Sequence, residues 1–335
     1  MKNISYTKTR IALLLSLAVV VLSSCERSFS DDVEFAEFPA NGDIFTDAPV
    51  GLTDEFFESF DPATGANPEG FGTDDNVAFQ GTSSIRIDVP APDDPDGPFI
   101  GGIFRDRGAG RNLTSFDALT FYAKGSTTAT IGEVGFGTDF GENRFAVVAQ
   151  NIRLSTDWRK VIIPIPDASK LVQERGMFLF SAGTQSTNGF GFTFWIDELR
   201  FETLGTIGQP NPAIFDGQDI VSETFNGSEF VITGLTQTFN LESGINQTVI
   251  AAPAYYDYTS SDNGVAIVTG SGVVSVIGEG TASITAQVAS VGAAGSLEVT
   301  STGTLPLAPT PSVLAADVSS LFSNAYVNAV EVDVN

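Results

Sequence analysis

The sequence predicts an all-β protein built from two successive β-sandwiches. Short runs of alternating apolar and polar residues, separated by Gly, Pro, Asn and Asp, recur between about residues 54 and 202. A second set of such runs, richer in Val, Thr, Ser and Ala, follows between about residues 218 and 303. No helical period competes over these lengths, and a hydrophobic content of 42% is enough to fill two cores.

The first predicted sandwich covers residues 54–203, where many short strands at regular spacing favour an antiparallel jelly-roll arrangement. The clearest runs are Ser84–Val89, Ala118–Ala123, Arg144–Val148, Lys160–Ile165, Met177–Phe180 and Phe190–Ile196. In the last run, strict alternation places Phe190, Phe192, Phe194 and Ile196 on the core face. Trp195 then points to the opposite face.

The remaining segments are predicted from composition. Residues 25–53 are polar and acidic and are predicted to be a tether, and residues 204–217 are rich in Gly and Pro, which indicates a linker. The second sandwich is predicted over residues 218–303. Residues 304–335 indicate a proline-rich hinge followed by the start of a further, incomplete module.

The N-terminal segment predicts a secretory signal over residues 1–24. Lys2, Lys8 and Arg10 precede an apolar run from Ile11 to Leu22, which is shorter than the roughly 20 residues that span a bilayer. The sequence Leu22-Ser-Ser-Cys25 resembles a bacterial lipobox, which implies that Cys25 is lipidated and anchors the protein in the outer membrane. Acidic residues soon afterwards resemble export signals and favour an exterior-facing position. The alternative is an ordinary signal peptide with a chance cysteine.

The composition excludes several kinds of chemistry. The chain has no histidine and one cysteine, so it cannot build a Ser-His-Asp triad or a His-ligated metal centre. Its net charge of −25 repels nucleic acid and anionic polymers, and we therefore expect no nucleic-acid partner. The same charge supplies carboxylates that suit calcium.

Two sets of sequence phrases resemble known families. In the first sandwich they are Leu119–Gly125, Val134–Gly137, Asp157–Lys160, Ile163–Lys170, Arg175–Phe178 and Phe194–Phe201. Together they resemble the jelly-roll, galactose-binding-like carbohydrate-binding modules of surface glycan-binding lipoproteins in polysaccharide-utilisation systems, and also accessory modules of family 16 glycoside hydrolases. In the second sandwich, Tyr258–Asp262, Val265–Val268 and Gly280–Ala286 resemble the bacterial Ig-like group 2 domain, which implies a spacer.

If the first sandwich binds sugar, flat aromatic side chains are the first candidates, because their faces stack on pyranose C–H surfaces. Trp195 is the leading candidate, and the alternative is that it packs beneath a loop. Trp158 begins a strand and is expected in the core. The turn around Phe140 and Asn143 adds an aromatic ring and an amide.

Two arginines form an unusual basic cluster in this acidic chain. Arg107 and Arg111 either clamp sugar hydroxyls or balance the nearby carboxylates of Asp106 and Asp117. Both interpretations remain open at this point.

The resemblance to jelly-roll modules also implies a structural calcium ion between the first and last strands. The candidate ligands are Asp197 on the last strand, with Glu58, Asp74 and Asp75. The alternative is a solvated acidic loop without a metal.

No catalytic motif is present. Family 16 hydrolases carry a Glu-x-Asp-x-x-Glu strand, and the nearest segment, Trp195–Glu202, has tryptophan in place of the first glutamate. The sequence therefore predicts a non-catalytic surface lipoprotein that captures a polysaccharide, a neutral β-glucan such as β-1,3-glucan, and passes it to a porin or to degrading enzymes. Alternatives are the N-terminal, non-catalytic part of a family 16 hydrolase, or a structural adhesion protein if both tryptophans are buried.

Overall fold

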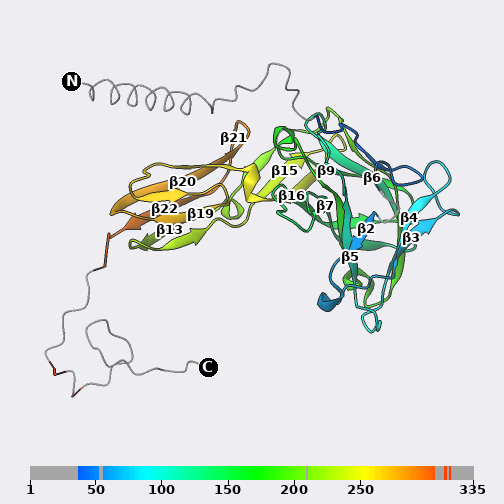
Figure 1. Ribbon diagram of the computed structural model, residues 1–335, viewed down its shortest axis with the longest axis horizontal. Helices are drawn as coiled ribbons and strands as arrows, with labels where there is room; N and C mark the ends of the chain where they lie inside the picture. The colour runs from blue at the N-terminus through cyan, green and yellow to red at the C-terminus, as the bar shows by residue number, and fades with distance from the viewer. Residues whose placement is uncertain (1–36, 53–55, 209, 306–312, 315–316, 318–335) are drawn as a thin grey trace, which may run out of the picture. The chain divides into compact units, whose positions relative to one another are not determined.

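The computed structural model describes residues 37–52, 56–208, 210–305, 313–314 and 317, and its long elements are all strands (Figure 1). The all-β prediction is confirmed. Short 3₁₀ turns lie at Pro62–Thr64, Ala168–Lys170, Gln185–Thr187, Phe215–Gly217 and Pro253–Tyr255. The predicted signal peptide, Cys25 and most of the predicted tether and C-terminal segment lie outside the described residues. Within the described ranges, no helix has the length and apolar character needed to cross a membrane.

One sheet of the first sandwich, here called the β11 sheet, is centred on the longest strand. In spatial order it contains β3 (Phe71–Asp74), β4 (Ser84–Val89), β11 (Phe192–Glu202), β6 (Ala118–Gly125) and β9 (Arg159–Pro164), with β1 (Asp43–Phe45) also paired to β11. All of these pairings are antiparallel, as the alternating sequence pattern predicts.

The opposing sheet, here called the β10 sheet, has eight strands. In spatial order they are β12 (Asn211–Ala213), β15 (Thr236–Asn240), β16 (Asn246–Ala251), β8 (Val147–Leu154), β7 (Ala129–Phe136), β10 (Gly176–Ala182), β5 (Ile100–Arg105) and β2 (Phe57–Ser59). Strand β16 pairs with β8 through Ile250 and Val148. The hydrogen-bonded ladder therefore continues beyond the predicted linker at residues 204–217.

Phenylalanine rings from the two sheets meet in the core of the first sandwich. Phe180 of β10 contacts Phe194 of β11 edge-on at 6.1 Å between ring centroids, and Phe121 of β6 contacts Phe178 of β10 at 5.6 Å. Such aromatic pairs add about 0.5–1.5 kcal/mol each beyond the area they bury. The sheets thus pack face to face, in the jelly-roll arrangement that the sequence predicts.

The alternation predicted for residues 190–196 is confirmed from Phe192 onward and is wrong for Phe190. Phe192, Phe194 and Ile196 are buried, and Trp195 points to the other face. Phe190 is 75% exposed, because β11 begins only at Phe192. A turn with left-handed backbone at Asn188 precedes it and keeps Phe190 outside the sheet.

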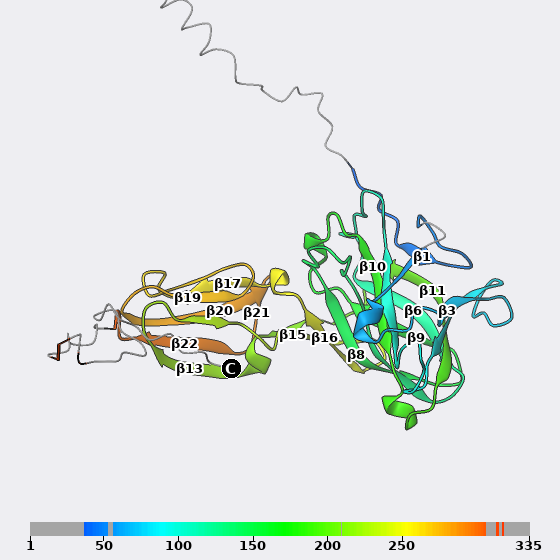
Figure 2. The same ribbon diagram turned by 60° about the horizontal axis from the view of Figure 1, so that its bottom comes forward.

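A second sandwich follows, and Figure 2 shows its strands running side by side. One sheet contains β13 (Asp219–Thr224), β22 (Ser296–Ser301), β20 (Gly280–Val288) and β17 (Asp257–Ser260), with β21 (Val291–Gly292) paired to β20; the other contains β14 (Glu229–Val231), β19 (Val273–Val276) and β18 (Ala266–Val268). Val274, Ile284 and Val299 are buried between them. The predicted bounds 218–303 enclose these strands, and they also enclose β15 and β16 of the β10 sheet.

Arg111 is an internal clamp and is not available to a sugar. Its side chain is buried, and its guanidinium donates hydrogen bonds to the backbone carbonyl oxygens of Asp43 and Val50. It also lies 3.2 Å from the carboxylate of Asp106. Of the two interpretations given for Arg111, the structure contradicts the sugar clamp and favours the balancing role, since the side chain ties the segment around β1 to the sandwich.

We expect Arg111→Met to lower the free energy of unfolding by about 3–5 kcal/mol, because it removes the guanidinium partner of the Asp106 carboxylate and of three backbone carbonyl groups. Urea denaturation measures the change. The matched control is Arg107→Met: the Arg107 side chain is 47% exposed and pairs with Glu58, so its loss should cost less than about 1 kcal/mol. Equal costs for the two variants would contradict the clamp.

Candidate functional site

The loop from residue 137 to 145, between β7 and β8, holds an aromatic ring toward solvent. Phe140 is 43% exposed and has a left-handed backbone, with φ of 56°, which is rare for a bulky residue. The Asn143 side-chain oxygen accepts a hydrogen bond from the Asp139 backbone N–H at 3.0 Å, and the Asp139 carboxylate accepts one from Gly141 N–H at 2.8 Å. These internal bonds define the loop conformation and thereby the position of Phe140.

The segment from 170 to 176 faces this loop and presents a buried carboxylate. Glu174 is 7% exposed, and its Oε1 accepts hydrogen bonds from the backbone N–H groups of Arg175 and Gly176, both at 2.8 Å. Among the described residues, Oε2 accepts no hydrogen bond. Burial raises the pKa of Glu174, although the two backbone donors act in the opposite direction.

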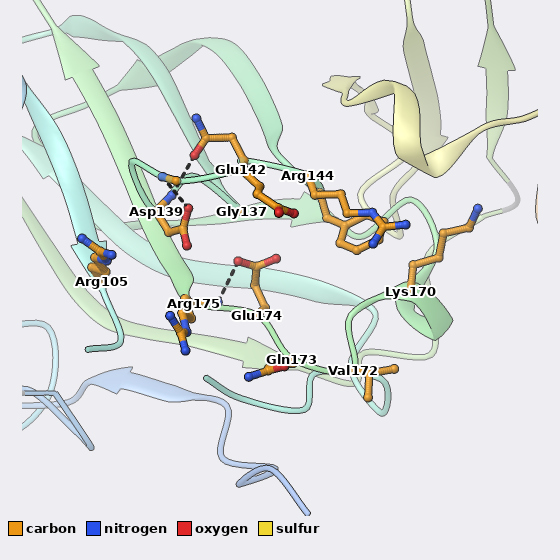
Figure 3. A pocket seen from close by; sticks show the side chains of 13 residues that line it. Arg105, Gly137, Asp139, Glu142, Arg144, Lys170, Val172, Gln173, Glu174 and Arg175 are labelled. Atoms are coloured by element: carbon orange, nitrogen blue, oxygen red, sulfur yellow. Dashed lines mark hydrogen bonds between the residues drawn. The ribbon is translucent and has the colours of Figure 1, made fainter. Parts of the chain in front are cut away.

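The loop, the facing segment and Arg105 line a cavity of about 610 Å³. Figure 3 shows Glu174 near its centre, with Arg105 and Arg175 on one side and Arg144 and Lys170 on the other. Among the residues that the structure describes, Arg144 and Arg175 form no ion pair. Their donors remain available for a ligand.

Donors and acceptors are nearly balanced in this cavity. The carboxylates of Asp139, Glu142 and Glu174 share it with three guanidinium groups and one ammonium group. Guanidinium groups donate only and carboxylates accept only, whereas a sugar hydroxyl does both. The lining therefore suits a neutral ligand rich in hydroxyl groups.

The outer face of the β10 sheet leads from this cavity past a pair of aromatic rings. The Phe60 ring lies over Gly101, and a Cβ atom added to Gly101 would come within 2.8 Å of that ring. The ring centroids of Phe60 and Phe140 are 5.9 Å apart. On the same face, the Gln150 side chain donates a hydrogen bond to the Glu133 carboxylate at 3.0 Å. Glu133 in turn is the β7 residue that pairs with Ser181 of β10. Phe60, Phe140, Gln150, Glu133 and Ser181, together with the cavity, are called the β10-face site below.

The structure brings together only part of the predicted sugar-binding set. Phe140 and Asn143 belong to the β10-face site, and Arg107 lies on the adjoining edge, where it pairs with Glu58 at 3.1 Å. Trp195 lies on the outer face of the opposite sheet, and its indole N–H donates to Asp74 Oδ2 at 3.0 Å. Trp195 and Trp158 are both partly exposed. The alternative of a structural adhesion protein required both tryptophans to be buried, and that condition is not met.

The four carboxylates proposed for calcium do not fit a shared site. Asp197 is fully buried and accepts hydrogen bonds from the backbone N–H groups of Phe79, Gln80 and Glu198. The other three lie apart, as Glu58 pairs with arginine, Asp74 bonds Trp195 and Asp75 is exposed. Within the described part of the chain, no group of three or more acidic or cysteine side chains could hold a metal ion.

Most members of the site escape sequence reasoning, which proposed only Phe140 and Asn143. Glu174 and Phe60 lie in unremarkable segments, and only the pairing of β10 with β5 and β7 brings those segments to the 137–145 loop. Arg144 stands within the predicted turn, but the sequence carries no signal that it forms no ion pair with any described residue.

Residues 43–203, somewhat under half of the chain, match the model of the family described as carbohydrate binding domain 30. The match covers the whole β11 sheet and the β10-face site. This part of the chain is therefore similar to a carbohydrate-binding module.

Solved structures add likenesses of low identity. A family 30 carbohydrate-binding module is 19% identical over 49% of this chain and 98% of its own, with a TM-score of 0.34. A family 11 module from Clostridium thermocellum, in complex with a β-1,3-1,4-mixed-linked tetrasaccharide, is 13% identical over 49% and 97%, with a TM-score of 0.33. A β-1,2-glucanase from Parabacteroides distasonis is 12% identical over 81% of this chain and 40% of its own, with a TM-score of 0.36. None of the curated proteins matches.

Glu174 predicts a pH-dependent stability. Because burial raises its pKa above the value in the unfolded chain, the folded state loses stability as pH rises through the folded-state pKa. We expect Glu174→Gln to be more stable than the parent at about pH 7, and the difference to close as pH falls to about 4, where the unfolded carboxyl also protonates. Urea midpoints across this range measure the effect. The control is Glu142→Gln, at an exposed position, whose stability should follow that of the parent at every pH. A stability gain in Glu174→Gln that does not change with pH would contradict the raised pKa of Glu174.

Proposed function

We propose that this protein is a non-catalytic binding protein for a neutral extracellular polysaccharide, and that the glycan lies on the β10-face site. The exposed ring of Phe140 beside a cavity with balanced donors and acceptors is the observation that carries the proposal. An aromatic face supplies stacking, and convergent polar groups at its edge orient the hydroxyls. The family match over residues 43–203 supports the same ligand class.

The charge supports a neutral glycan. Sulfated and uronate chains meet long-range repulsion from a protein of net charge −25. Within the class we propose a β-glucan, with β-1,3-glucan as the first candidate, since that is the ligand implied by the families that the sequence resembles.

We extend the proposal to the setting in which the protein works. The lipobox-like sequence before Cys25 and the acidic residues after it support a lipid-anchored protein on the outer face of the outer membrane. There it would capture polysaccharide and pass it to a porin or to degrading enzymes, with the second sandwich as a spacer.

Affinity electrophoresis of the full chain, in native gels containing laminarin, xylan, mannan, starch or alginate, tests the proposal. We expect retardation by a neutral glucan and free migration in alginate. Phe140→Ala should weaken the interaction by about tenfold, as expected for loss of an aromatic anchor. The matched control is Phe225→Ala in the second sandwich, where the ring is 42% exposed. Free migration in every gel would overturn the proposal.

A further inference from the structure

Both tryptophans of the chain lie in one row across the outer face of the β11 sheet. Trp195 on β11 pairs with Arg86 on β4 and with Lys124 on β6. Trp158 immediately precedes β9, whose residue Arg159 pairs with Ala123, so the register continues from Lys124 to Trp158. The row therefore reads Arg86, Trp195, Lys124, Trp158.

The backbones that carry the two tryptophans are separated by two strand spacings, or about 9.6 Å. That separation is close to the length of a disaccharide unit in an extended glycan. Both tryptophans are partly exposed, so each offers part of its apolar ring to a ligand, on either side of Lys124.

Neighbouring groups hold both rings in place. Asp74 accepts the Trp195 N–H at 3.0 Å. The hydrogen bond from the Asn76 backbone N–H, and then the one from Trp195, lowers the pKa of Asp74. Trp158 contacts Phe79 edge-on at 6.0 Å, and Phe79 stacks on Tyr122 with centroids 3.6 Å apart. A surface ordered in this way binds with less loss of side-chain freedom.

The loop that carries Phe79 is itself anchored. Asp197 accepts hydrogen bonds from the backbone N–H groups of Phe79 and Gln80, at 2.7 and 3.0 Å. Asp47 accepts two more, from Thr82 and Ser83. The loop is thus held with Phe79 stacked on Tyr122 and against the edge of the Trp158 ring.

Polar groups beside the row suit a neutral ligand. Arg86 forms a bonded pair with Asp88, so its charge is compensated, and Thr193 donates to the same carboxylate. Among the described residues, Lys124 forms no ion pair and keeps its donors available. Flat apolar faces bordered by donors are the pattern that an extended, uncharged glycan requires.

We infer that the Trp158–Trp195 row is a second glycan-binding surface, on the face opposite the β10-face site, which stacks two sugar rings of an extended neutral polysaccharide. The inference rests on the proposed function for its ligand class but not for its location. With one surface on each face of the sandwich, a single long chain or two chains can be bound by one molecule. Binding to a polymer then gains from bivalency, while a short oligosaccharide occupies each surface separately.

Tryptophan fluorescence isolates this surface, because the chain has only two tryptophans and both lie in the row. The full chain is titrated with laminarin, or with the gel polysaccharide that retards it most, and acrylamide quenching is measured before and after. We expect the glycan to reduce quenching in the parent and also in Phe140→Ala. Trp195→Phe and Trp158→Phe keep a ring at each position and identify which indole is protected.

Affinity gels provide the second readout. Trp158→Ala combined with Trp195→Ala should weaken retardation by about tenfold, and adding Phe140→Ala should abolish it. Phe190→Ala, at an exposed aromatic outside both surfaces, is the control and should have no effect. Retardation of the parent without any change in quenching, or without loss in the double variant, overturns the second surface and leaves the proposed function intact. Absence of retardation in the parent overturns the proposed function itself.

Discussion

The packing of phenylalanine rings between the β10 and β11 sheets is the interaction on which both candidate surfaces depend. Phe178 and Phe180 point inward from β10, and Phe194 points inward from β11. Because side chains alternate along a strand, Leu179 must face outward on one side of the sandwich and Trp195 on the other. A slip of one residue would exchange the inward-facing and outward-facing side chains of a strand, so the core also decides which side chains can meet a ligand.

Buried charges in this protein hold segments in place. Arg111 and Asp197 both attract attention in the sequence as functional candidates, and both are used internally. Arg111 is bonded to backbone carbonyl groups around β1, and Asp197 to backbone N–H groups of the loop that carries Phe79. Each charge is compensated by several partners, which is the condition under which burial of an ion is tolerated. Their contribution to binding is therefore indirect, through the position of the loops.

The composition restricts the means by which this chain can recognise a ligand. Because the chain has no histidine and its one cysteine is not among the described residues, stacking, hydrogen bonding and charge are what those residues offer a ligand. Within the described part of this strongly acidic chain, Arg144 and Arg175 form no ion pair, and they line a cavity that carboxylates also line. A mixed lining of this kind matches hydroxyl groups, which donate and accept, better than it matches a single charge.

Local periodicity was sufficient to determine the fold class, the inward positions of β11 and the outward direction of Trp195, because alternation is a property of each strand alone. The sequence also determined what is absent from the chemistry, since residue types can be counted. It did not determine which outward residues are neighbours: Phe140 meets Phe60, and Trp195 shares a row with Trp158, through strand pairings between distant segments. Nor did it separate Arg107 from Arg111, two similar residues four positions apart, of which one is exposed and one buried. Pairing register and burial depend on long-range contacts, and only the tertiary structure decides them.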